Sequence, residues 1–440
     1  MSVEIPADGL PAEKIFEKLS ELRSSDGNWR AGKTWSLVFY AGEDVYDVAK
    51  KAYLEYFSEN ALNPAVFPSL RQMEYEVVKM GASLLGDPQA CGNMTSGGSE
   101  SLLLAVKTAR DWARAHRGID DPEMVLPITA HPALLKAAHY FGVRPVITPV
   151  REDFRADVDA IERAIGPKTV LVVASAPQYP HGVVDPIEEI AEVTLRFDIP
   201  FHVDACLGGY LLPWVRELGY KVPQFDLSVE GVWSLSADLH KYGFAAKGAS
   251  TIFYKSREYR KHQFFAYAGW PGGLYGSPSI LGTRPGGAIA AAWAVMNYLG
   301  REGYLRLART IMDTTSKLKE AIEATESLFV LGKPHMSVFA FTSRDEEIDI
   351  TKVGALMYDK GWRLDRQQLP DSLHMMVTPV HAGIVEQFSK DLHDSVIRAR
   401  SDATKMAQKV SHYGGITESK SQEQLKKKEE AILGFLDALV

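Results

Sequence analysis

The chain has 440 residues, 46% of them hydrophobic, which is enough for a large buried core and for two or three domains. Its 49 basic and 56 acidic residues give a net charge of −7, which offers no electrostatic reason to expect a nucleic-acid partner. Two cysteines cannot build a disulfide framework, and this composition favours a reducing compartment such as the cytoplasm.

The two candidate segments for membrane insertion are the N-terminus and the longest apolar stretch, and neither has the pattern that predicts it. The first 22 residues lack the basic start and apolar block of a signal peptide. The longest apolar stretch, residues 286–300, is short and rich in Gly and Ala, which favours a buried helix over a membrane span. We therefore expect a protein without stable membrane insertion.

The N-terminal segment, residues 1–65, contains amphipathic helical patterns at 11–23 and 44–59. Between them, residues 27–34 read GNWRAGKT and match the phosphate-loop pattern G-x-x-x-x-G-K-[ST]. That loop needs a buried strand before it and a helix after it. Here a polar helical segment precedes the match and a strand-like run follows, so we interpret the match as coincidence and do not predict an ATPase.

Residues 66–320 alternate between helices and short apolar strands, which predicts the large domain. The predicted helices are 71–85, 99–116, 132–142 and 185–197, and the predicted strands are 124–129, 144–150, 169–176 and 200–205. Strands that are apolar throughout and alternate with helices indicate a parallel sheet covered on both faces. The fold class is therefore α/β with a mostly parallel central sheet.

Residues 321–410 predict a smaller α/β domain, closed by a helix at 383–402. Residues 411–440 predict a polar link followed by a tail helix at 422–440, which we interpret as a docking or oligomer helix. Leu425, Ile432, Leu436 and Leu439 share one face of that helix.

Three parts of the large domain suggest a cofactor site. Residues 94–101, MTSGGSES, open a long helix whose free N–H groups favour an anion. Asp204 ends an apolar strand, where α/β sheets place ligand-binding groups. Lys241 lies among small and apolar residues, where desolvation lowers the pKa of an amine and makes it nucleophilic. An anion loop, a strand-end carboxylate and a reactive lysine together meet the needs of pyridoxal 5'-phosphate, and we predict no metal ion.

The segments TSGGSES, SAPQYPHGVVDP, HVDACLGG, SADLHKYGFAAKGAS and GTRPGG closely resemble the sphingosine-1-phosphate lyase family, in the group II decarboxylase branch of fold-type I pyridoxal-phosphate enzymes. The resemblance spans roughly residues 28 to 400. It implies an aspartate-aminotransferase-like fold and a homodimer whose subunits share their active sites.

The resemblance also implies roles for individual residues. Lys241 corresponds to the lysine that forms a Schiff base with the cofactor, His131 to the residue that stacks on its ring, and Asp204 to the partner of its pyridine nitrogen. The residues implied for the cofactor phosphate are Gly98, Ser99 and His240. The residues implied near the substrate are Tyr179, Lys247, Thr283, Arg284 and Asn63, with Thr283 and Arg284 on a loop that reaches the neighbouring subunit.

The N-terminal segment departs from the family pattern. Asn63 stands where the family has a histidine, and residues 35–44, WSLVFYAGED, replace a small-residue SGAVY type of segment. The cofactor core matches more closely than the substrate region does. The first hypothesis is a carbon–carbon lyase acting on a phosphorylated long-chain base, with Tyr179 and Lys241 moving protons. An amino-acid decarboxylase and a non-catalytic scaffold that retains the fold remain as alternatives.

Overall fold

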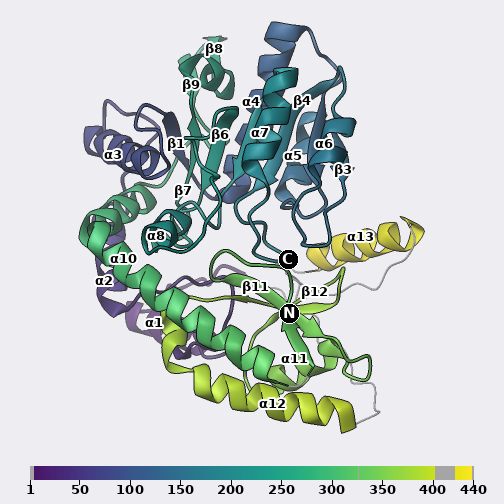
Figure 1. Ribbon diagram of the computed structural model, residues 1–440. Helices are drawn as coiled ribbons and strands as arrows, with labels where there is room; N and C mark the ends of the chain where they lie inside the picture. Colours follow the sequence, from purple (N-terminus) through teal and green to yellow (C-terminus); the bar gives the residue numbers. More distant parts are fainter. Residues whose placement is uncertain (1–3, 326, 402–421, 439–440) are drawn as a thin grey trace.

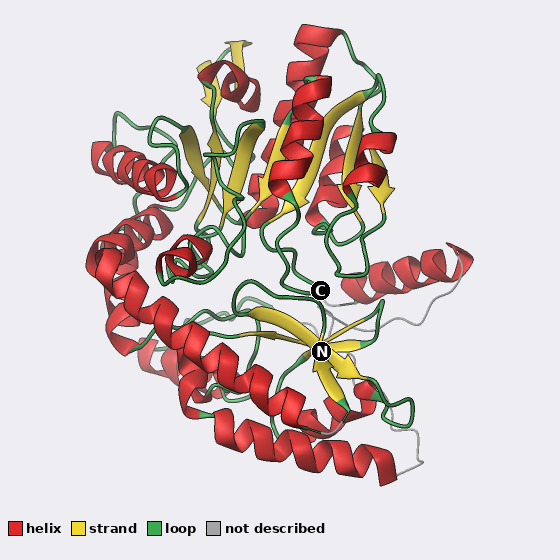
Figure 2. Ribbon diagram, viewed as in Figure 1, coloured by secondary structure: helices red, strands yellow, loops and turns green. Residues whose placement is uncertain are grey.

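The computed structural model describes residues 4–325, 327–401 and 422–438, and it contains a large and a small sheet set apart from each other (Figures 1 and 2). The large sheet has seven strands in the order β1-β7-β6-β5-β4-β2-β3. Its strands are β1 (Cys91–Thr95), β2 (Glu123–Pro127), β3 (Arg144–Thr148), β4 (Thr169–Ser175), β5 (Phe201–Asp204), β6 (Val232–Ala237) and β7 (Ser250–Tyr254). Strands β2 to β6 pair in parallel, and only β7 runs antiparallel to both of its neighbours, β6 and β1. The predicted α/β fold with a mostly parallel sheet is confirmed.

Helices cover both faces of this sheet because its central strands are apolar on both sides. All seven residues of β4 are buried. One face carries α4 (Gly98–Arg117) and α5 (Ala133–Phe141). The other face carries α3 (Pro68–Leu84), α6 (Val158–Ala164), α7 (Ile187–Phe197), α8 (Leu212–Glu217) and the start of α10 (Gly286–Ala324). The sequence did not indicate the exposed hairpin of β8 (Phe265–Trp270) and β9 (Gly273–Ser277), which follows α9 (Arg257–Arg260).

Helix α10 connects the two sheets, running along one side of the molecule from the large sheet to the small one (Figure 1). The apolar pattern at 286–300 predicts only its first part. Gly300 interrupts the helix with a φ of 52°, a left-handed conformation that glycine adopts without steric cost, and the helix then continues to Ala324. Within the described residues, none of the helices is both long and apolar enough to cross a membrane.

The small sheet is antiparallel, in the order β10-β11-β13-β12. It consists of β10 (Leu328–Val330), β11 (Val338–Ser343), β12 (Asp365–Gln367) and β13 (Ser372–Met376), packed against α11 (Ile350–Asp359) and α12 (Val385–Ser401). Helix α13 (Gln422–Asp437) follows the segment that is not described, and Leu439 of the predicted apolar face lies outside the described residues.

The N-terminal segment packs partly on the small sheet and its helices α11 and α12, which together we call the small domain. It contains α1 (Ala12–Arg23) and α2 (Glu43–Glu55), and between them Trp35 is fully buried against Trp362, His381 and Phe388. The phosphate-loop match lies just before Trp35 and forms a single 3-10 turn (Trp29–Ala31) with no strand in front of it. The interpretation of that match as coincidence agrees with this geometry.

Candidate active site

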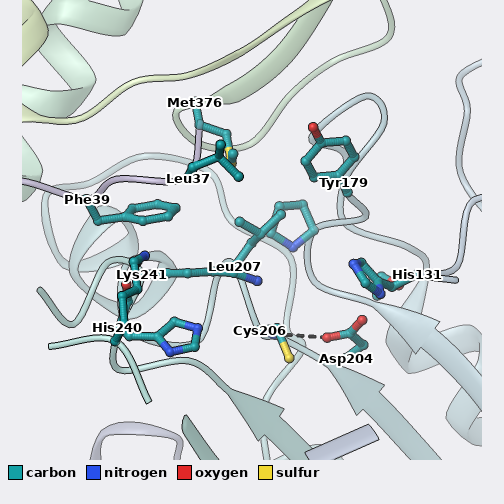
Figure 3. A pocket seen from close by; sticks show the side chains of 13 residues that line it. Leu37, Phe39, His131, Tyr179, Asp204, Cys206, Leu207, His240, Lys241 and Met376 are labelled. Carbon is teal, nitrogen blue, oxygen red and sulfur yellow. Dashed lines mark hydrogen bonds between the residues drawn. The ribbon is translucent and has the colours of Figure 1, made fainter. Parts of the chain in front are cut away.

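A pocket of about 240 Å³ lies between the large sheet and the small domain, next to the carboxyl ends of β4 and β5 (Figure 3). Parallel sheets commonly bind ligands at this edge. Its lining residues come from the N-terminal segment, the large domain and the small domain. They are Leu37, Phe39, His131, Ser175, Pro177, Tyr179, Asp204, Cys206, Leu207, His240, Lys241, Lys247 and Met376. Six of the side chains that the sequence singles out therefore meet in one place.

Asp204 is the last residue of β5, and this position turns its carboxylate into the pocket (Figure 3). One carboxylate oxygen accepts hydrogen bonds from the Cys206 backbone N–H (3.1 Å) and the Ser236 hydroxyl (3.4 Å). The side chain is therefore held in one orientation, as a partner for a ring nitrogen requires.

Lys241 points into the pocket from the loop after β6, and its ammonium lies 2.9 Å from the carboxylate of Asp238. Burial lowers the pKa of the Lys241 amine, but the charges of Asp238 and its other acidic neighbours outweigh burial and raise the pKa above its ordinary value. The expectation of an uncharged lysine is therefore wrong for this structure. Burial opposes ionisation of Asp238 as well, yet Lys241 and His240 hold the pKa of that carboxyl well below its ordinary value.

His131 and Tyr179 face the pocket from two different loops. His131 precedes α5, and its Nδ1 accepts a hydrogen bond from the Ala133 N–H (3.1 Å), which fixes the ring at the wall of the pocket. Burial lowers the pKa of His131, which favours the neutral form of the ring. Tyr179 follows β4, and its hydroxyl donates to Asp365 of the small domain (2.9 Å).

The first turn of α4 forms a cradle beside Lys241. A Cβ atom on Gly98 would lie 2.6 Å from an Asp238 carboxylate oxygen and 2.9 Å from the Cys206 sulfur, so only glycine fits there. The His240 ring is 3.3 Å from the corresponding position on Gly97. Among the described residues, the buried Nδ1 of His240 has no hydrogen-bond partner. A helix N-terminus and an unpaired imidazole nitrogen next to a lysine and a strand-end carboxylate fit pyridoxal phosphate.

Besides Gly98 in the cradle, four predicted site residues do not line this pocket. Ser99 is exposed in the first turn of α4, and Asn63 is exposed in a turn where its side chain accepts from the Ala65 N–H. Thr283 is also exposed. Arg284 is buried and forms a two-pronged ion pair with Glu74 (Nη2–Oε2, 2.9 Å), so its guanidinium has a structural partner in its own chain. The predicted contact of Arg284 with a substrate in the neighbouring subunit stays a prediction.

Several residues of the site were not predicted from the sequence. Asp238 and Cys206 both lie in quoted motifs, but their contacts with Lys241 and Gly98 depend on the folded loop. Glu100, also within a quoted motif, is buried and accepts from the Ser96 N–H (2.7 Å) and the Ile280 N–H (2.8 Å), which ties the cradle to the loop before α10. Leu37, Phe39 and Met376 carried no sequence pattern that points to a pocket.

The fold and the pocket define a fold-type I enzyme that uses pyridoxal 5'-phosphate. Residues 37–344 match the family described as pyridoxal-dependent decarboxylase conserved domain. The rice (Oryza sativa subsp. japonica) sphingosine-1-phosphate lyase is 48% identical over 405 residues, covering 90% of this chain and 74% of that protein. The rat enzyme, sphingosine-1-phosphate lyase 1, is 44% identical over 396 residues, covering 89% and 69%. The solved sphingosine-1-phosphate lyase of Burkholderia pseudomallei superposes with a TM-score of 0.88 at 39% identity, covering 91% and 94%. The chain belongs to the sphingosine-1-phosphate lyase family within the pyridoxal-dependent decarboxylases.

Proposed function

We propose that this protein is a carbon–carbon lyase that cleaves a phosphorylated long-chain base such as sphingosine 1-phosphate into a fatty aldehyde and phosphoethanolamine. The observation that carries the proposal is that one pocket is lined by Lys241, by Asp204, by a second lysine, Lys247, and by an apolar wall. The family of the chain supports the same activity.

The apolar wall suits a long hydrocarbon chain better than an amino acid. Leu37, Phe39 and Met376 lie together on one side of the pocket (Figure 3). Leu37 is 59% exposed and occupies the apex of a tight turn, with a φ of 69° and a Val38 N–H to Ser36 C=O hydrogen bond of 2.8 Å. A leucine in this conformation is strained, and such strain is typical of functional sites. Contact with an alkyl chain would give this exposed leucine an apolar partner.

Pyridoxal phosphate supplies an aldehyde that bonds to amines and a ring that stores the electrons of a broken Cα bond. Lys241 would be its covalent attachment point, and Asp204 would keep a proton on the ring nitrogen. His131 would stack on the ring. The N–H groups at the start of α4, together with His240, would hold the phosphate. We assign removal of the proton from the substrate β-hydroxyl to Tyr179 Oη, and return of a proton to Cα to Lys241 Nζ.

A substrate panel tests this function. Purified protein loaded with pyridoxal phosphate is incubated with phosphorylated long-chain bases and, separately, with free amino acids. We expect release of aldehyde and phosphoethanolamine from the former and no carbon dioxide from the latter. Decarboxylation of a common amino acid without aldehyde release from any phosphorylated base would favour the decarboxylase instead.

Lys247 should make turnover of a phosphorylated substrate sensitive to alkaline pH. Its ammonium donates to the His240 carbonyl (3.1 Å) and lies 5.1 Å from the centre of the Phe39 ring. Although Lys247 is exposed as a residue, desolvation of its amine within the pocket, with the nearby charge of Lys241, lowers the pKa of Lys247 to about 8. Because a phosphate binds the protonated amine, kcat/KM should fall by about tenfold per pH unit above that pKa.

Lys247→Arg is the matched control for this pH effect, since a guanidinium stays charged throughout the range. The alkaline fall in kcat/KM should move to higher pH in this variant, and Lys247→Met should lower kcat/KM at pH 7 by roughly 10-fold to 100-fold. Identical pH profiles for the wild type and Lys247→Arg would assign the alkaline limb to another group.

We further propose that the enzyme is a cytoplasmic homodimer. Large apolar side chains are exposed on the β8–β9 hairpin, and a partner subunit would cover them. They are Phe265, Tyr267, Trp270 and Leu274. Thr283 and Asn63 would contact the partner's substrate in that assembly. Cys91 and Cys206 are both buried and free, which suits a reducing compartment.

A further inference from the structure

Tyr179 is held by two neighbouring strands of the small sheet. Its hydroxyl donates to Asp365 Oδ2 (2.9 Å) on β12. Its ring stacks on His374 of β13 (centroids 4.2 Å apart, planes 30° apart), and its carbonyl accepts from His374 Nε2 (2.9 Å). Asp365 and His374 are paired across the two strands, so they form one rigid unit.

Asp365 is a buried carboxylate with hydroxyl partners instead of a cation. It is 8% exposed, and its side chain also interacts with the Ser36 hydroxyl. Burial raises the pKa of Asp365, although the Ser36 and Tyr179 hydroxyls oppose this. Its neighbour His374 is neutral, because burial lowers the pKa of that imidazole to about 3. In the part of the chain that the structure describes, no Lys or Arg forms an ion pair with Asp365.

Burying a carboxylate without a cation costs free energy of folding. A neutral side chain could accept the same hydrogen bonds without that cost, so a purely structural role does not explain Asp365. It is well suited to receiving a proton, because burial already disfavours its charged form. The hydroxyl hydrogen of Tyr179 is donated to Asp365. The oxygen atom, Oη, can therefore accept a proton from a bound substrate through a lone pair.

We propose that Asp365 is the positioning residue and proton acceptor for Tyr179. When Tyr179 Oη takes the proton of the substrate β-hydroxyl, the phenolic proton passes to Asp365 Oδ2. The O–H bonds of the substrate and of Tyr179 break, and new O–H bonds form at Tyr179 Oη and Asp365 Oδ2. After the aldehyde leaves, Asp365 returns its proton to Tyr179 Oη, which releases the proton taken from the substrate to water. Cα receives its proton separately from Lys241 Nζ, which regains one from water before the next turnover. The inference rests on the proposed function, since it needs a substrate hydroxyl to lose a proton. Because Asp365 belongs to the small domain, Tyr179 can accept the substrate proton only when that domain is packed against it.

A double-mutant cycle tests the coupling. Asp365→Asn keeps the shape and hydrogen-bonding capacity of the side chain, and Tyr179→Phe removes the hydroxyl. Each single variant should lower kcat for a phosphorylated long-chain base by roughly 10²-fold, with KM changed by less than about threefold. Asp365→Asn should cause no further loss in the Tyr179→Phe background. Losses that multiply in the double variant would overturn the proposal.

Two controls separate this role from general damage. Asp394→Asn removes an exposed carboxylate on α12 of the same domain and should leave kcat within about twofold of the wild type. The near-visible absorption of the bound cofactor and the midpoint of thermal unfolding report whether each variant is folded and loaded. If Asp365→Asn fails to fold, Asp365→Ser replaces it in the cycle.

A second measurement does not need the lyase reaction. In protein labelled with carbon-13 in its tyrosine rings, the Tyr179 resonance is identified as the one that Tyr179→Phe lacks. The pH titration of this resonance is then compared between the wild type and Asp365→Asn. The titratable groups that line the pocket or pack against Tyr179 are His131, Asp204, Cys206, His240, Lys241, Lys247, Asp365 and His374. All except Asp365 are the same in both proteins, so Tyr179 should ionise about one pH unit or more lower in Asp365→Asn. An unchanged titration would overturn the proposal, even if the substrate panel shows that the enzyme acts on another substrate.

Discussion

Lys241→Ala should abolish the near-visible absorption of the bound cofactor and lower turnover by roughly 10³-fold or more, because the variant lacks the proposed attachment point. Borohydride reduction of the wild type, followed by peptide mass spectrometry, should place the cofactor on Lys241. The pocket has one other lysine, Lys247, whose amine is held by the His240 carbonyl and lies near Phe39. Cofactor found on Lys247 would contradict the assignment.

Lys241→Arg is the matched control for this loss. It restores a cation next to the buried Asp238 but cannot bond to an aldehyde. We expect Lys241→Arg to be as inactive as Lys241→Ala but closer to the wild type in thermal stability, since Asp238 keeps an ionic partner. A wild-type protein that stays colourless after incubation with pyridoxal phosphate would instead favour a non-catalytic scaffold.

Glu74→Gln should destabilise the protein by about 3–5 kcal/mol, because it leaves the charge of buried Arg284 without a carboxylate. Glu74 Oε1 also accepts the N–H of Met94 (3.0 Å), so this one carboxylate ties α3 to β1 and to the loop before α10. The free energy of unfolding in urea, measured on the cofactor-loaded protein, reports the loss.

The double variant Glu74→Gln/Arg284→Met should recover most of that stability, since no buried charge is left unpaired and the amide oxygen can still accept the Met94 N–H. Single variants that lose less than about 1 kcal/mol would show that water or other groups replace the missing carboxylate. Because Arg284 does not line the pocket, KM in the folded single variants should change less than their stability.

Most of the large domain was predictable because its elements carry local patterns. The apolar run of β4 and the periodic helices α4 and α7 are each visible within a dozen or so residues. Strands β1, β6 and β7 were not among the predicted strands, and the antiparallel direction of β7 was not predictable, since a buried strand has the same composition in either direction. The continuation of α10 beyond Gly300 was also missed, because glycine normally ends a helical pattern.

For the candidate site as well, residues in local sequence patterns were predicted, whereas contacts formed by folding were not. Asp204, His131 and Lys241 were found because each follows or lies within a recognisable segment. The ion pair between Asp238 and Lys241 was missed although three positions separate them, and it reverses the expected direction of the lysine pKa. The contact between Tyr179 and Asp365 joins residues 186 positions apart, so no local pattern can indicate it.

The five residues from Trp35 to Phe39 contribute both to the small-domain core and to the wall of the ligand cavity. Trp35 is fully buried in the small-domain core, whereas Leu37 and Phe39 face the ligand cavity. Attempts to re-engineer substrate preference by randomising this stretch will therefore mix two outcomes, altered selectivity and failed expression. A library that holds Trp35 fixed and varies Leu37 alone would separate them.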